Sequence, residues 1–69
     1  MQTANNYFED TFSATDLSND QTLVVQIEGN DSQGFYTYAF DDEYNCVLQA
    51  TWSHKPTRQE VCSLFNLEY

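Results

Sequence analysis

Two runs of β-branched and aromatic residues, at positions 22–28 and 35–41, flank six residues that are all Gly, Asn, Asp, Ser or Gln. β-branched and aromatic side chains favour strands, whereas Gly, Asn, Asp and Ser favour turns. The sequence therefore predicts two neighbouring antiparallel strands joined by a turn at residues 29–34. We expect the rest of the chain to be built around this hairpin.

The two predicted strands differ in how their side chains alternate. In the first, Leu23, Val25 and Ile27 share one face, and the other face is polar apart from Val24. In the second, neither face is strongly polar, with Tyr36, Tyr38 and Phe40 against Phe35, Thr37 and Ala39. Either this strand is covered on both faces, or its tyrosines form an exposed patch for a partner. For so small a chain we favour the first, because Tyr is often only partly buried.

A third strand is predicted at residues 46–52, after a polar turn at residues 42–45. Its alternate side chains would form one inward-facing row, made of Cys46, Leu48, Ala50 and Trp52. Cys46 and Cys62 are too few for a disulfide framework and lack the spacing of a zinc site. We expect both to be small buried apolar side chains, with a single strand-to-helix disulfide as the alternative.

Residues 7–14 fit two kinds of element. Phe8 and Phe12 are four positions apart, as on one face of a helix. The same two residues also share one face of a strand, and the β-formers around Phe12 suit a strand better. We favour a strand, which residues 17–20 would connect to the strand at 22–28.

The strongest local signal in the chain is a capping box at residues 57–60. The Thr57 hydroxyl and the Glu60 carboxylate would each accept a hydrogen bond from an otherwise unpaired backbone N–H, so a helix begins there. Asn66 is suited to end it in the left-handed conformation. The helix is too short to be stable alone, so its apolar stripe must pack on the sheet. That stripe consists of Val61, Leu64 and Phe65.

Together these segments predict an α+β fold, a small antiparallel β-meander of three to four strands with one C-terminal α-helix packed on one face. The 69 residues make one small domain, of which residues 1–6 are expected to be a loose N-terminus. So small a core gives marginal stability, and the formation of a homodimer is one way in which the fold could be stabilised further. With no signal peptide and no long apolar run, we expect a soluble, cytoplasmic protein without membrane contact.

Charge is the clearest pointer to function. The chain has eleven Asp and Glu residues but only two basic ones, Lys55 and Arg58, and a net charge of −9. The acidic residues before Lys55 would lie in turns, at strand ends and on the face away from the helix, giving a field of one sign. Such a field repels nucleic acid and acidic membranes, and it attracts a basic surface.

We therefore predict a partner-binding acidic face accompanied by partner-binding tyrosines. The acidic residues are Glu9, Asp10, Asp20, Glu28, Asp31, Asp41, Asp42 and Glu43, and the tyrosines are Tyr36, Tyr38 and Tyr44. Carboxylates at alternate positions of a strand stand roughly 7 Å apart, which is comparable with the step between phosphates along a nucleic-acid strand. Asp, Glu and exposed Tyr on a sheet can therefore occupy a groove that binds a phosphate backbone and bases.

In size, charge and composition the chain resembles the small acidic proteins that phages and mobile elements encode against host nucleic-acid enzymes, such as anti-CRISPR, anti-restriction and uracil-glycosylase inhibitor proteins. The resemblance implies inhibition without catalysis, in which a DNA-mimic-like face blocks a basic, nucleic-acid-binding surface of a host protein in the bacterial cytoplasm. It assigns no role to an individual residue. The alternative is a generic interaction or assembly module, which could be homodimeric, whose acidic surface serves solubility only.

No catalytic, cofactor or metal site is predicted. His54 is the sole histidine, and Ser53 beside it would face the opposite way on an extended chain. Cys62 could approach His54, but nothing in the sequence orients the pair. Residues 41–45 resemble the start of an EF-hand loop but lack its glycine and its flanking helices. The sequence thus predicts a binding protein rather than an enzyme.

Overall fold

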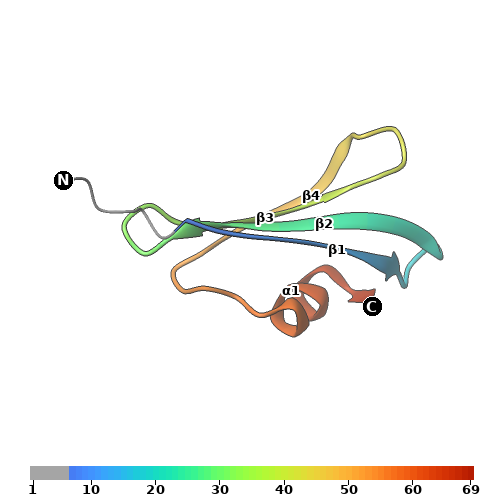
Figure 1. Cartoon of the computed structure of the whole chain (residues 1–69). Coiled ribbons are helices and arrows are strands. Elements are labelled where there is room, and N and C mark those ends of the chain that lie inside the picture. The colour runs from blue at the N-terminus through green and yellow to red at the C-terminus, as the bar shows by residue number, and fades with distance from the viewer. Residues whose placement is uncertain (1–6) are drawn as a thin grey trace.

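The computed structural model describes residues 7–69, which form a five-stranded antiparallel sheet and one α-helix (Figure 1). In chain order the elements are β1 (Phe8–Asp16), β2 (Gln21–Asn30), β3 (Gly34–Phe40), β4 (Cys46–Trp52), α1 (Arg58–Phe65) and β5 (Leu67–Glu68). The strand order across the sheet is β4-β3-β2-β1-β5. The predicted α+β class and the meander are confirmed for β1 to β4. The expected loose N-terminus, residues 1–6, lies outside the described residues.

The sheet has five strands rather than the expected three to four because the chain returns to β1 after the helix. Asn66 adopts the left-handed conformation (φ 61°, ψ 49°) and ends α1, as predicted. The chain then reverses, so that Leu67 pairs with Asp16 and Glu68 pairs with Thr15 of β1. This two-residue strand covers part of one edge of the sheet.

β1 confirms the strand that we favoured for residues 7–14. All its residues pair with β2, from Phe8 opposite Gly29 to Asp16 opposite Gln21. The turn between the two strands is held by Asp16, whose Oδ1 accepts hydrogen bonds from the Ser18 N–H at 2.9 Å and the Ser18 hydroxyl at 2.6 Å. These bonds from Ser18 lower the pKa of Asp16.

The hydrophobic core lies between α1 and one side of the sheet, which we call the inner face. It contains the predicted row of β2 together with residues of four other elements: Phe12, Ala14, Leu23, Val25, Ile27, Ala39, Val61, Cys62, Phe65 and Leu67. Burying an aliphatic or aromatic side chain of this size contributes about 1.5–3 kcal/mol. The amphipathic helix is stable because Val61, Cys62 and Phe65 are buried against the sheet. Leu64 of the predicted stripe is exposed, so that part of the prediction is wrong.

Cys46 does not join the inner row of β4, and the expectation that it is buried is wrong. The pairing of β3 with β4 shifts between Ala39 and Phe40, so that Ala39 lies opposite Leu48 but Phe40 lies opposite Cys46. This bulge moves Cys46 out of alternation with Leu48. Cys46 is exposed, Cys62 is buried, and both thiols are free. Burial raises the pKa of the Cys62 thiol.

Candidate functional site

The outer face of the sheet is the side opposite α1, and among residues 7–69 no helix or strand covers it (Figure 1). The register places on it Glu9, Thr11, Ser13, Val24, Gln26, Glu28, Tyr36, Tyr38, Phe40, Gln49 and Thr51. Tyr36, Tyr38 and Phe40 are therefore only partly buried, whereas Phe35, Thr37 and Ala39 are buried on the inner face. The favoured expectation of a β3 covered on both faces is wrong for this part of the chain.

Three of the predicted binding residues form one row across the outer face. Glu9 lies opposite Glu28, and Glu28 lies opposite Tyr36 on its other side. Like charges directly opposite each other are destabilising, so this pair lowers the stability of the isolated protein. Gln26 Nε2 donates to Glu28 Oε1 at 2.6 Å. Burial and the Glu28 carboxylate raise the pKa of Tyr7.

Aromatic rings continue the outer face along β3. The ring centroids of Tyr38 and Phe40 are 6.2 Å apart, with the ring planes tilted by 32°. The Tyr36 hydroxyl donates to the Gln33 carbonyl oxygen at 2.9 Å, which holds that ring toward the β2–β3 turn. Tyrosine suits a partly wet contact surface because it offers both apolar area and a hydroxyl.

Two acidic turns lie at one end of the sheet. The turn from β1 to β2 and the turn from β3 to β4 are at the same end because the strands are antiparallel (Figure 1). We call this region the acidic end, made of Asp20, Asp41, Asp42 and Glu43. Asp20, Asp42 and Glu43 are exposed. Their charges are therefore open to a partner.

Asp41 organises the second of these turns. Its Oδ1 accepts hydrogen bonds from the backbone N–H groups of Asn45 and Glu43, each at 2.9 Å. These two bonds lower the pKa of Asp41. The turn holds Tyr44 in a left-handed conformation, φ 65°, with 89% of its surface exposed. A large aromatic side chain presented in this way is a candidate contact residue.

Both basic side chains pack against β1 on the inner side. Lys55 Nζ lies 3.9 Å from the centroid of the Phe8 ring. Arg58 Nε and Nη2 donate to the two carboxylate oxygens of Asp10 at 2.6 and 2.7 Å, and the guanidinium lies 4.7 Å from the Phe12 centroid. Asp10 is thus paired on the helix side and does not lie with the other predicted acidic residues.

Asp31 is also apart from the acidic end. It lies in the turn between β2 and β3, at the opposite end of the sheet. There it lines an open hollow together with Tyr7, Phe8, Asn30, Ser32, Phe35 and Lys55. The structure therefore brings the predicted residues together in two groups. Glu9, Glu28, Tyr36 and Tyr38 share the outer face, and Asp20, Asp41, Asp42, Glu43 and Tyr44 share the acidic end.

Several exposed or partly exposed residues were not among the predicted ones, and two of them, Val24 and Phe40, add apolar area to the outer face. Val24 is 42% exposed on the outer face, and it was visible in the sequence as the break in the alternation of β2. Phe40 follows Tyr36 and Tyr38 at the two-residue period of the same strand face. Glu68 lies opposite Thr15, and no sequence signal marks it because β5 has only two residues.

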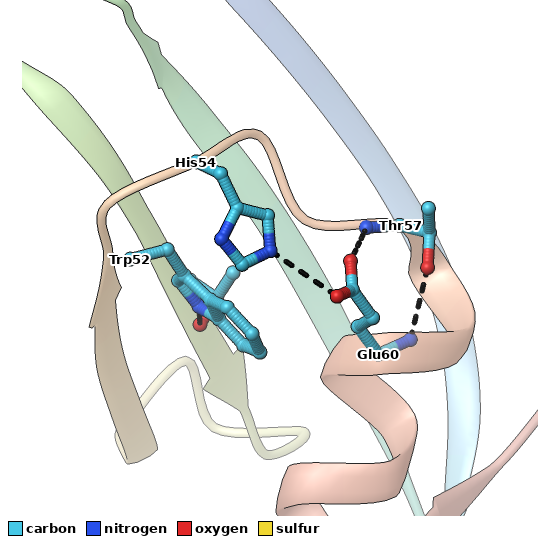
Figure 2. Close-up of polar contacts among 5 residues, drawn as sticks. Trp52, His54, Thr57 and Glu60 are labelled. Atoms are coloured by element: carbon cyan, nitrogen blue, oxygen red, sulfur yellow. Dashed lines mark hydrogen bonds and ion pairs between the residues drawn. The ribbon is translucent and has the colours of Figure 1, made fainter.

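His54, the residue considered first for catalysis, belongs to the cap of α1 (Figure 2). Its Nε2 lies 3.1 Å from Glu60 Oε2, and its ring meets Trp52 edge-on with centroids 5.7 Å apart. Glu60 Oε1 accepts the Thr57 N–H at 2.9 Å, and Thr57 Oγ1 accepts the Glu60 N–H at 3.1 Å, which is the predicted capping box. The bond from Thr57 and the contact with His54 lower the pKa of Glu60. These contacts anchor the start of the helix.

Comparison with known proteins gave no matching family model, no matching curated protein and no matching solved structure. Between residues 7 and 69, no three His, Cys, Asp or Glu side chains are grouped so that they could hold a metal ion. The same stretch contains no helix with the length and apolar character needed to cross a membrane. The functional argument therefore rests on the outer face and the acidic end.

Proposed function

We propose that this chain is a non-enzymatic acidic binding protein that blocks a basic, nucleic-acid-binding surface of another protein, in the manner of the anti-CRISPR and anti-restriction inhibitors of phages and mobile elements. The observation that carries the proposal is the separation of charge. Both basic side chains, Lys55 and Arg58, pack against aromatic rings of β1 on the inner side. The outer face and the acidic end carry carboxylates and tyrosines without a basic side chain among them.

The acidic end would act first, at long range. Its carboxylates project from turns, where they attract a Lys- and Arg-lined channel and increase the rate of encounter. Tyr44, which is exposed at the same end, would then make the first aromatic contact. This step predicts an association rate that falls as salt is added, because exposed charges are screened.

The outer face would act at short range. A partner Lys or Arg placed beside Glu9 and Glu28 would relieve the repulsion between these opposed carboxylates. Binding would thus recover stability that the free protein lacks. Tyr36 and Tyr38 lie next to this site on β3 and offer rings to groups that otherwise stack on nucleic-acid bases.

The proposal is tested by capture and competition. The immobilised full chain should recover a nucleic-acid-binding protein from a bacterial lysate at low salt, and the purified pair should dissociate when DNA or RNA is added in excess. The Asp42→Asn/Glu43→Gln variant should bind weakly. The control variant Asp31→Asn/Glu60→Gln changes the net charge equally but outside the acidic end, and Gln is tolerated in a capping box, so its binding should change little.

Salt dependence separates this function from the alternative of a generic assembly module. A charge-led inhibitor loses affinity steeply as sodium chloride is raised. A partner that is held equally well at high salt, or that ignores competing nucleic acid, would contradict the proposal and favour the module with a merely solubilising surface.

A further inference from the structure

β4 is an open edge of the sheet. It is the first strand in the order β4-β3-β2-β1-β5, and among residues 7–69 no strand pairs with its free side. The other edge is partly covered where β5 pairs with β1. Natural edge strands usually carry Lys, Pro or inward-pointing charges that block further pairing. β4 has none of these, because its sequence is Cys-Val-Leu-Gln-Ala-Thr-Trp, and its bulge, another feature that hinders pairing, is confined to its start beside Cys46.

The apolar side chains of β4 also lack a full cover. α1 has eight residues and is about 12 Å long, whereas the protein extends over 48 Å along its longest axis. The helix lies beside β5 and away from β4 (Figure 1). Leu48, Ala50 and Trp52 are therefore only partly buried on the inner face, and Val47 is 48% exposed. Apolar side chains therefore remain partly exposed along the open edge.

We propose that β4 pairs with β4 of a second copy of this chain, antiparallel about a two-fold axis at Gln49. This register sets Leu48 of each copy opposite Ala50 of the other, so the partly buried apolar side chains of the two inner faces lie side by side. Gln49 lies opposite Gln49 on the outer face. An isologous pairing of this kind closes the free edge in both copies at once.

The uncharged sequence of β4 allows a second copy to pair here, and the acidic turn beside it selects the direction of pairing. Each copy has a net charge of −9, and β4 has no charged side chain, so two copies can pair here without setting carboxylates opposite each other. β4 starts directly after the acidic turn at Asp41, Asp42 and Glu43. Antiparallel pairing puts the two acidic turns at opposite ends of the interface, away from each other. Parallel pairing would set both acidic turns side by side.

This inference goes beyond the proposed function and does not depend on it. A two-fold axis perpendicular to the sheet leaves both helices on one side and both outer faces on the other. The dimer would then present one continuous outer face with an acidic end at each extremity. Because added salt screens the repulsion between the copies, the dimer should become tighter with salt, whereas binding to a basic partner should weaken.

The position of the axis is tested with the full chain in analytical ultracentrifugation. Gln49→Glu and Gln49→Lys each set like charges opposite each other, and each should raise the dimer dissociation constant about tenfold or more. An equimolar mixture of the two variants should restore the dimer, because only then does Glu face Lys. Thr11→Glu and Thr11→Lys, on the exposed outer face of β1, are the matched controls and should leave the dimer unchanged.

Cross-linking gives a second readout. In a Cys46→Ser background, Gln49→Cys should form a disulfide-linked dimer on mild oxidation, and Thr11→Cys should not. A wild-type chain that stays monomeric at high concentration in salt would overturn the inference. A dimer that is insensitive to both Gln49 variants, or one that the mixture fails to restore, would also overturn it.

Discussion

Arg58 binds Asp10 through two hydrogen bonds of 2.6 and 2.7 Å, although 48 positions separate the two residues. The bond joins the first residue of α1 to the third residue of β1 and so fixes the helix on the inner face. The Arg58 guanidinium lowers the pKa of Asp10. Arg58 therefore neutralises a carboxylate on the inner side, and the carboxylates of the outer face keep their negative charge without a basic neighbour.

Replacing Asp10 with Asn keeps the side-chain size but removes the charge that Arg58 binds. The free energy of unfolding should fall, and the loss should be non-additive with Arg58→Met in a double-mutant cycle. Glu9→Gln is the matched control on the neighbouring position of β1. It removes a carboxylate that faces Glu28, so the free energy of unfolding should stay the same or rise. Urea denaturation measures all four variants, and equal losses for Asp10→Asn and Glu9→Gln would contradict the assigned pairing.

The free energy of unfolding should also fall as the pH is lowered into the acid range. Bonds within the fold lower the pKa of four carboxyl groups, those of Asp10, Asp16, Asp41 and Glu60. A carboxyl with a lowered pKa stabilises the folded state above its unfolded pKa of about 4, and this contribution is lost as the pH falls through the folded pKa. For Asp10, the difference in stability between wild type and Asp10→Asn should be constant above about pH 5 and shrink below about pH 4. A difference that stays constant down to about pH 3 would show that the ion pair is not its source.

Local signals were enough to predict most of the elements. The alternation at Leu23, Val25 and Ile27 identified β2 and its buried face, and the bounds of β4 agree with the predicted residues 46–52. The capping box at Thr57 and Glu60 located the start of the helix because both bonds form between residues three positions apart. Such features depend on the sequence within a single element and can be read without a partner.

Features that depend on the register between distant segments were missed. β5 exists because the left-handed turn at Asn66 returns two residues to β1, and two residues carry no periodicity. Cys46 is exposed because a bulge breaks the alternation of β4. The excess of negative charge was evident from the sequence, but the position of each carboxylate was not. Only the pairing of the strands shows which carboxylates lie on the outer face, which lie at the acidic end, and that Asp10 lies on the inner side.

Gly29 should not tolerate a side chain. It has φ 142°, and an added Cβ would collide with the Gly34 carbonyl oxygen and lie 2.7 Å from Phe35 Cα, both of which are backbone atoms that cannot turn aside. Gly29→Ala should therefore cost about 1–3 kcal/mol from overpacking, in addition to backbone strain. Gly34→Ala is the control, because with φ 87° its Cβ would meet nothing closer than 3.8 Å, and it should cost only the strain. Equal losses for the two variants in urea denaturation would refute the crowding at Gly29.

The capping box should contribute measurably to stability. Thr57→Ala removes the acceptor of the Glu60 N–H, and N-cap substitutions of this kind cost about 0.5–2 kcal/mol. Thr57→Ser keeps the hydroxyl and should retain most of the stability. Ser63→Ala, on the exposed side of α1, is the control for helix propensity and should not destabilise the protein. If thermal unfolding shows the same midpoint for Thr57→Ala and Thr57→Ser, the hydroxyl is not the stabilising group.

Tyr44 should lower the stability of the free protein through its strained backbone and strengthen binding through its exposed ring. A bulky residue at φ 65° is strained, and Asn accepts this conformation more readily, so Tyr44→Asn should raise the free energy of unfolding by up to about 1 kcal/mol. The same variant should weaken binding to the captured partner, because it removes the most exposed aromatic ring of the described residues. Tyr44→Phe keeps both the ring and the strain, and it should change neither quantity much. If Tyr44→Asn gains stability and binds as tightly as wild type, Tyr44 lies outside the contact surface. If it loses stability, the left-handed backbone at this position is supported by the tyrosine side chain itself.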